Sequence, residues 1–146
     1  MTALAATVLL LVAGGAGLVV QNTVMLAVRE QAASIWSALW LNSLVGLVML
    51  TVVVVGSDRL RPFQRLVAGA GWWMLIPGVL GTLYVLASLR GYATIGATAT
   101  IALLVSSQLI AGLVADSART GSLMLRPMVG AGLLLVGVAL IVTGRG

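Results

Sequence analysis

The chain has 146 residues, of which 61% are hydrophobic and 8% are charged, and its mean hydropathy is +1.19. Soluble domains carry about 25% charged residues, and a chain of this length cannot bury so much apolar surface in one core, so soluble globular and disordered proteins are both excluded. The net charge of +5 comes from eight Arg against three acids. These charges lie between apolar runs, as in the loops of membrane proteins, so they do not indicate nucleic-acid binding.

Five apolar runs follow one another along the chain. A membrane-spanning helix needs about 20 predominantly apolar residues, and the runs that approach this length are 2–28, 34–55, 71–89, 94–115 and 128–143. We therefore predict an all-α membrane protein, with a single transmembrane domain over 1–146 embedded in the lipid bilayer. The first run lacks a basic start and is too long for a cleaved signal peptide, so we expect it to be a span.

The connections between the runs differ in length. The short segments 29–33 and 90–93 predict tight antiparallel hairpins, whereas 56–70 and 116–127 are longer and are typical of interfacial loops. The first of these loops favours a short amphipathic turn at 61–67. Five Arg on the N-terminal side against three on the other weakly favour a cytoplasmic N-terminus, and leave both fixed and dual insertion open.

Polar side chains inside a bilayer are costly unless they are paired or solvated, so they indicate functional positions. The candidate substrate-binding residues are Gln21, Trp40, Asn42, Ser43, Tyr84, Ser88, Ser107 and Gln108. Three charges at the ends of runs are candidate gating or edge groups: Glu30, Arg90 and Asp116. The alternative for the uncharged residues is interhelical hydrogen bonding. The run 128–143 has no such side chains, so we expect it to pack against a neighbour or a dimer partner, and we expect Pro77 to kink its span.

Several chemistries are disfavoured. The chain has no Cys and no His, which removes thiol and imidazole chemistry and the usual zinc ligands. It has no phosphate-binding loop, dinucleotide fingerprint or hydrolase motif. We therefore expect no enzyme activity, no metal and no cofactor. A carboxylate at mid-membrane is also missing, which counts against simple proton antiport.

The second half of the chain contains the most specific pattern. It comprises Trp72-Trp73, Gly78-x-x-Gly81, Tyr84, Ser88, Gly96-Ala97-x-Ala99-Thr100, Gln108, Asp116 and Arg126-Pro127 before a Gly-rich last run. Gln21 and the spacing of 38–46 fit the same pattern. On these residues the chain resembles the YdcZ-like family, small five-helix proteins of the drug/metabolite transporter superfamily. It departs from that family at Met25, where Asn is common, at Asn42-Ser43, where Ser-Phe is usual, and at Ser107, where Gly is usual.

The resemblance implies half of an inverted-repeat transporter. Larger members of the superfamily contain two five-helix halves inserted in opposite senses, so a five-helix chain would pair with an oppositely inserted copy, as a homodimer or with a sister protein. The expected function is then an inner-membrane small-molecule transporter that works by alternating access as an antiparallel dimer, with the substrate unnamed. The alternative is a structural or accessory membrane subunit without transport activity of its own.

Overall fold

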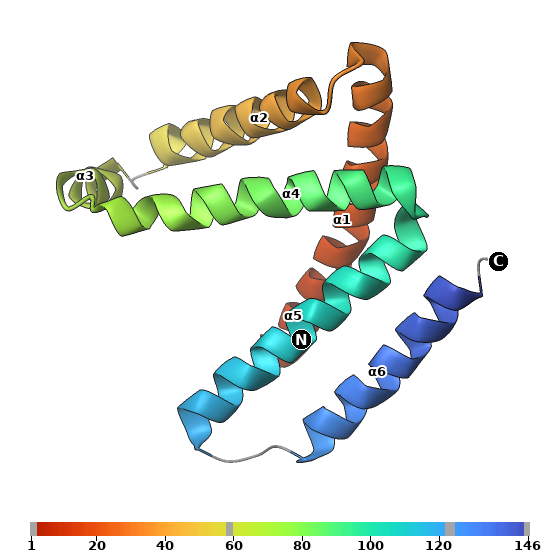
Figure 1. Ribbon diagram of the computed structural model, residues 1–146. Coiled ribbons are helices and arrows are strands. Elements are labelled where there is room, and N and C mark those ends of the chain that lie inside the picture. The colour runs from red at the N-terminus through yellow and green to blue at the C-terminus, as the bar shows by residue number, and fades with distance from the viewer. Residues whose placement is uncertain (1–2, 58–59, 122–124, 145–146) are drawn as a thin grey trace. The chain divides into compact units, whose positions relative to one another are not determined.

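All secondary structure in the described part of the protein is helical (Figure 1). The computed structural model describes residues 3–57, 60–121 and 125–144. In chain order the elements are α1 (Ala3–Ala32), α2 (Ile35–Gly56), α3 (Leu60–Ala68), the 3-10 helix η1 (Trp72–Leu75), α4 (Ile76–Thr94), α5 (Gly96–Thr120) and α6 (Leu125–Thr143).

Five helices in these residues are long and apolar enough to cross a membrane, as the sequence predicts. They are Leu4–Ala32, Ile35–Gly56, Trp72–Thr94, Gly96–Thr120 and Leu125–Thr143. The short α3 confirms the amphipathic turn expected near 61–67. Two charges of the second loop, Asp58 and Arg59, lie outside the described residues, as does Arg145 near the C-terminus.

The helices extend beyond the apolar runs that predict them. α1 continues past Arg29 and Glu30 to Ala32, α4 continues past Arg90 to Thr94, and α5 continues past Asp116 to Thr120. A charged side chain ends an apolar run, but it does not end a hydrogen-bonded helix, because its stem lies along apolar surface while its head reaches water.

Pro77 lies inside the span Trp72–Thr94, at a change of helix type and not in the middle of a continuous α-helix. The polypeptide forms the 3-10 turn Trp72–Leu75 and changes to α-helix at Ile76, so Pro77 is in the first turn of α4. The N–H groups of a first turn have no intrahelical partner, and proline is tolerated there without breaking the helix.

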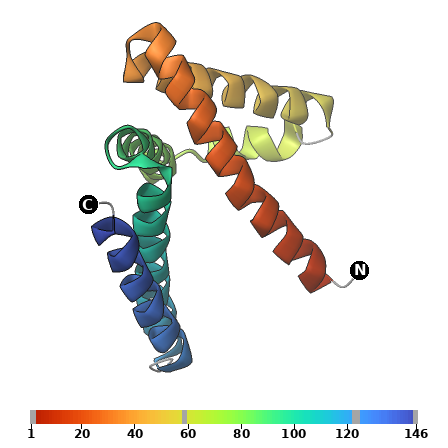
Figure 2. The same cartoon turned by 90° about the vertical axis from the view of Figure 1, so that its right-hand side faces the viewer.

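The chain divides into two compact units, Met1–Leu89 and Arg90–Gly146, which we describe separately. This division is by internal contacts, and the single transmembrane domain over 1–146 stays a prediction. In the first unit, α1, α2 and α4 share a core of Met25, Ala38, Leu39 and Leu89. The core side chains of α1 and α2 lie in the halves next to their turn, and beyond it the two helices diverge (Figures 1 and 2). The tight hairpin expected at 29–33 is therefore tight only near the turn.

The turn between α1 and α2 is fixed by local backbone interactions. Ala33 has a φ of 49°, in the left-handed region that costs a residue with a side chain some strain. Ser34 then caps α2, and its hydroxyl accepts a hydrogen bond from the Ser37 N–H at 3.4 Å. Two residues thus reverse the chain, and this reversal brings the C-terminal half of α1 to the N-terminal half of α2.

In the second unit, α5 and α6 run antiparallel, side by side (Figures 1 and 2). α5 ends at Gly121, whose φ of 64° is a left-handed cap and whose N–H donates to the Ser117 carbonyl at 2.9 Å. At the other end of α5, Thr100 lies against Gly91 in the last turns of α4. A Cβ added at Gly91 would meet Thr100 Cγ2 at 2.5 Å, so this approach needs glycine.

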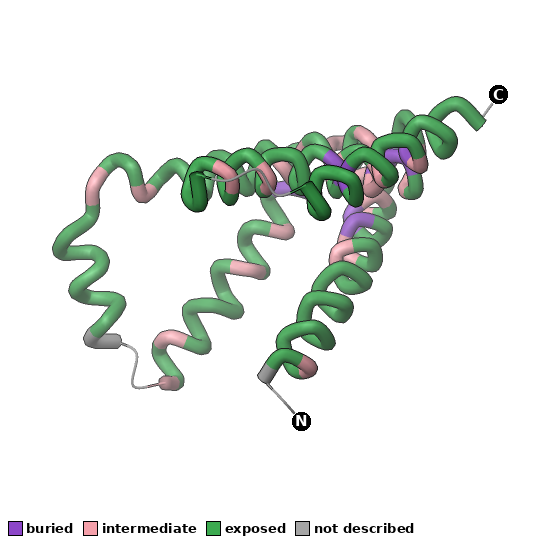
Figure 3. The backbone as a smooth tube through the Cα atoms, turned by 90° about the horizontal axis from the view of Figure 1, so that it is seen from below, coloured by how far each residue is buried: buried purple, intermediate pink, exposed green. Residues whose placement is uncertain are grey.

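Most of the described helical surface is exposed (Figure 3). Large apolar side chains are exposed along every span, from Leu10 on α1 to Leu140 on α6, at 74% and 68%. In water such surface would be unstable, whereas in a bilayer the lipid chains cover it. The small internal core is therefore consistent with a protein whose solvent is lipid.

Candidate functional site

A pair of carboxamides joins α1 and α2. Gln21 Nε2 donates a hydrogen bond to Asn42 Oδ1 at 2.8 Å. Both side chains line a recess of about 290 Å³ whose remaining walls are Val24, Met25, Val28, Ala38, Leu41 and Val45. Two of the eight residues predicted to bind substrate, 21 positions apart in the chain, are thus brought together from neighbouring helices in an otherwise apolar recess.

The polar and aromatic residues near this pair in the sequence do not line the recess with it. Trp40 is 66% exposed and does not line the recess, and Ser43 is also exposed. Asn22, which the sequence places beside Gln21, is 3% exposed. Substrate contact by Trp40 and Ser43 stays a prediction, and the recess itself provides only two polar side chains.

A second polar set follows one face of α4. Tyr84, Ser88 and Tyr92 are spaced by four residues and so lie above one another on the helix. Tyr84 is half-buried, Ser88 is 0% exposed and Tyr92 is 7% exposed. Within the described residues, the hydroxyls of Ser88 and Tyr92 are buried without a hydrogen-bond partner. Such groups cost free energy, so each of the two hydroxyls indicates a position where a polar ligand or water supplies the missing partner.

Tyr92 is absent from the set predicted from the sequence. The apolar run of this span ends at 89 because Arg90 follows, and this end places Tyr92 in the predicted connection 90–93. The signal that could have found it is the spacing: Tyr92 continues the interval from Tyr84 to Ser88 by one more turn of helix.

The hydroxyls and the carboxamide in the middle of α5 differ in their hydrogen bonding. The hydroxyls of Thr100 and Ser106 donate to the carbonyls of Gly96 and Ala102, each at 2.7 Å, and Ser107 donates to Leu104 at 2.8 Å. Gln108 is exposed near the middle of this 25-residue helix. A carboxamide there cannot be satisfied by lipid, so it requires a polar partner or water.

The three candidate edge charges are all exposed. Glu30 lies in the last turn of α1, Arg90 lies four residues before the end of α4, and Asp116 lies four residues before the end of α5. Positions near helix ends suit charges that reach the headgroup layer. Among the described residues, no three acids come together as a possible metal site.

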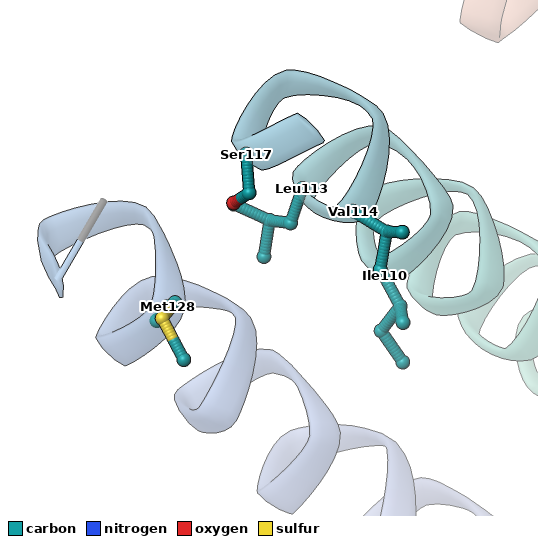
Figure 4. A pocket seen from close by; sticks show the side chains of 5 residues that line it. All are labelled: Ile110, Leu113, Val114, Ser117 and Met128. Carbon is teal, nitrogen blue, oxygen red and sulfur yellow. The ribbon is translucent and has the colours of Figure 1, made fainter. Parts of the chain in front are cut away.

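Two further recesses are apolar and shallow. In the second unit, one of about 340 Å³ lies at the α5–α6 hairpin, where Met128 of α6 and side chains of α5 line it (Figure 4). Another, of about 470 Å³, follows one face of α4 around Gly78 and Thr82. Ser117 and Thr82 are the polar residues among their linings, and the Thr82 hydroxyl donates to the Gly78 carbonyl of its own helix. Such surfaces suit lipid chains or a packing helix better than a polar ligand.

Five apolar spans, with uncharged polar side chains inside α1, α2, α4 and α5, define a polytopic α-helical membrane protein. Residues 6–144 match the family described as "Putative inner membrane exporter, YdcZ", and the chain belongs to this family. It is 45% identical over 139 residues to the Inner membrane protein YdcZ of Escherichia coli strain K12, which covers 92% of this chain and 93% of that protein. No solved structure matches the chain. The protein is accordingly a multi-pass protein of the inner membrane, and its family is one of exporters rather than enzymes.

Proposed function

We propose that the protein is a subunit of an inner-membrane exporter of small polar, uncharged molecules, which works by alternating access as an antiparallel dimer. The observation that carries this proposal is the recess lined by Gln21 and Asn42. Its other walls are apolar, and its two carboxamides can exchange their mutual hydrogen bond for bonds to a ligand. Both amides are neutral, so the recess suits a ligand that does not need a counter-charge.

Gln108 gives independent support. The side chain is exposed at the middle of a membrane-crossing helix, where facing lipid would leave two donors and an acceptor unsatisfied. A second copy of the chain or a water-filled path would satisfy it. Ser107, next to it, is exposed as well, although its hydroxyl already donates within the helix.

The number of spans supports the proposed dimer. Five crossings leave the two termini on opposite faces of the membrane, so an inverted copy, or a sister protein inserted the other way, would complete a two-fold repeat of the kind that builds midplane sites in transporters. The exposed face of α6 is where we expect packing or dimer contact.

The accessory-subunit alternative has one observation in its favour. The hydrogen bond between Gln21 and Asn42 is also what two helices need to hold together in lipid, where such bonds contribute about 0.6 kcal/mol on average. In this alternative the polar residues bind only protein, and no substrate passes.

Substitution of Gln108 by Leu separates the two functions. Inside-out membrane vesicles from a strain without its own copy are tested for uptake with a panel of radiolabelled uncharged metabolites. If the protein transports, Gln108→Leu lowers flux of the responding compound by about tenfold or more while cross-linking still yields the dimer. An accessory subunit shows no responding compound and loses the dimer instead.

The matched control is Gln31→Leu, the same substitution at an exposed position in the last turns of α1. It removes an equal carboxamide from a site near the headgroups, where water satisfies it, so flux and dimer should both stay unchanged. A loss of flux in both variants would mean that the effect is not specific to the middle of α5.

A further inference from the structure

The helix α3 has two chemically different faces. Phe63, Leu66 and Val67 are spaced by three and four residues and therefore share one face, whereas Gln64 and Arg65 lie on the other. The sequence of this segment has a further Arg at position 61. The helix thus has an apolar half and a cationic half.

The apolar half of α3 is not covered by the described residues of its own unit, Met1–Leu89. Phe63, Leu66 and Val67 are 49%, 54% and 58% exposed. A helix of nine residues is shorter than the roughly 12–15 that an isolated helix needs to persist in water. An external apolar surface must therefore stabilise it.

The chain holds α3 at the edge of the bilayer. Three residues separate Gly56, the end of α2, from Leu60, and three separate Ala68 from Trp72, the start of the next span. Fully extended, each connection reaches about 14 Å, so neither end of α3 can move far from the membrane surface. Trp72 and Trp73, 78% and 58% exposed, lie directly after it and are of the residue type that marks the interface.

The charge of this segment selects the kind of lipid. Between Ser57 and Gly71 the sequence has three Arg against Asp58, so a net positive charge lies beside the headgroups. Arginine pairs well with phosphate, and a basic amphipathic helix binds anionic membranes through its polar face while its apolar face enters the acyl boundary.

We propose that α3 is an interfacial helix that binds anionic phospholipid, with Phe63, Leu66 and Val67 among the acyl chains and Arg65 at the phosphates. It lies parallel to the membrane plane between two spans and collects anionic lipid around the loop that joins them. This inference rests on other residues than the proposed transport function and does not depend on it.

The experiment uses the full-length protein in nanodiscs. The chain has no cysteine, so Val67→Cys carries one bimane label on the apolar face. Quenching is compared between discs that contain phosphatidylglycerol brominated on its acyl chains and discs with brominated phosphatidylcholine at equal mole fraction. The expected result is quenching by the anionic lipid at least about twofold greater, with the excess lost at high salt.

Variants test the role of charge. Arg65→Gln should remove the excess while quenching by phosphatidylcholine persists, and Arg65→Lys should keep most of it. The matched control Arg119→Gln, in the last turn of α5, should leave the excess unchanged. Circular dichroism and a monodisperse elution profile verify that each variant is folded.

Two outcomes overturn the proposal. Equal quenching by both lipids would mean that α3 lies in the interface without selecting charge. No quenching by either lipid would mean that its apolar face is covered by protein, such as a second copy or a soluble partner, and not by the membrane.

Discussion

At the scale of single residues, hydroxyl and carboxamide side chains find their hydrogen-bond partners in different ways. Thr51 and Thr143 donate to the carbonyls of Leu47 and Ala139 in their own helices, as do many other Ser and Thr residues here. A Gln or Asn has more polar groups than its own helix can satisfy. Gln21 and Asn42 therefore satisfy each other across α1 and α2.

We expect this pair to be coupled energetically. In a double-mutant cycle with Gln21→Leu and Asn42→Leu, each single variant leaves one carboxamide unpaired, and the double variant removes both. The coupling in the free energy of unfolding should be about 0.6 to 1.7 kcal/mol, measured by denaturation in mixed micelles. A coupling of zero would mean that the two amides are hydrated independently in the folded protein.

The sequence shows which polar residues lie inside the apolar runs, but it does not show which of them form hydrogen bonds with one another. Gln21 and Asn42 are conspicuous in apolar runs, but their pairing depends on the register that the turn at Ala33 and Ser34 imposes on two helices. Trp40 has the same prominence in the sequence and lies exposed, because only a three-dimensional arrangement decides which face of α2 meets α1.

At the scale of elements, the junction of α4 and α5 depends on two glycines, Gly91 and Gly96. A single residue, Ile95, connects the two helices, and Gly96 adopts a φ of 74° at the start of α5. With so short a connection the helix ends must approach closely, and Gly91 lies directly against Thr100.

Gly91→Ala should therefore destabilise the protein by about 1–3 kcal/mol, because its Cβ would overlap Thr100 Cγ2 and Oγ1. The measurement is the free energy of unfolding in mixed micelles. Thr100→Ala in the same chain removes both overlapping atoms and should restore part of the loss. The matched control is Gly112→Ala on α5, where nothing lies within 4 Å, and it should not destabilise.

Apolar runs predict that five spans exist, but they do not predict where the helices end. The amphipathic period of 61–67 is enough to indicate α3. Backbone hydrogen bonding determines that Trp72–Leu75 is a 3-10 helix, and that α4 and α5 continue past Arg90 and Asp116. Hydropathy does not report on these hydrogen bonds.

At the scale of the whole molecule, the small internal core suits an assembly. Few side chains are buried within the described residues, and Gln108 in mid-span requires a polar neighbour. The weak Arg asymmetry between the two sides permits insertion in both senses.

We therefore expect dual insertion. Gly146→Cys provides a single thiol, which a membrane-impermeant maleimide labels in intact cells and then after permeabilisation. About half of the protein should be labelled from outside, since a five-to-three Arg bias is small. Ser57→Cys, at the end of α2, should give the complementary fraction. Complete labelling from one side would contradict a homodimer of inverted copies and would leave a sister protein as the partner.

The pairing of Gln21 with Asn42 also bears on biogenesis. A helix such as α6, whose Thr143 hydroxyl donates to the Ala139 carbonyl of the same helix, can leave the translocon alone, because that polar group is already satisfied. α1 and α2 differ, because either amide alone would enter lipid unpaired. The two-residue turn between them lets both helices partition together, so the ribosome would deliver this hairpin to the membrane as one insertion unit.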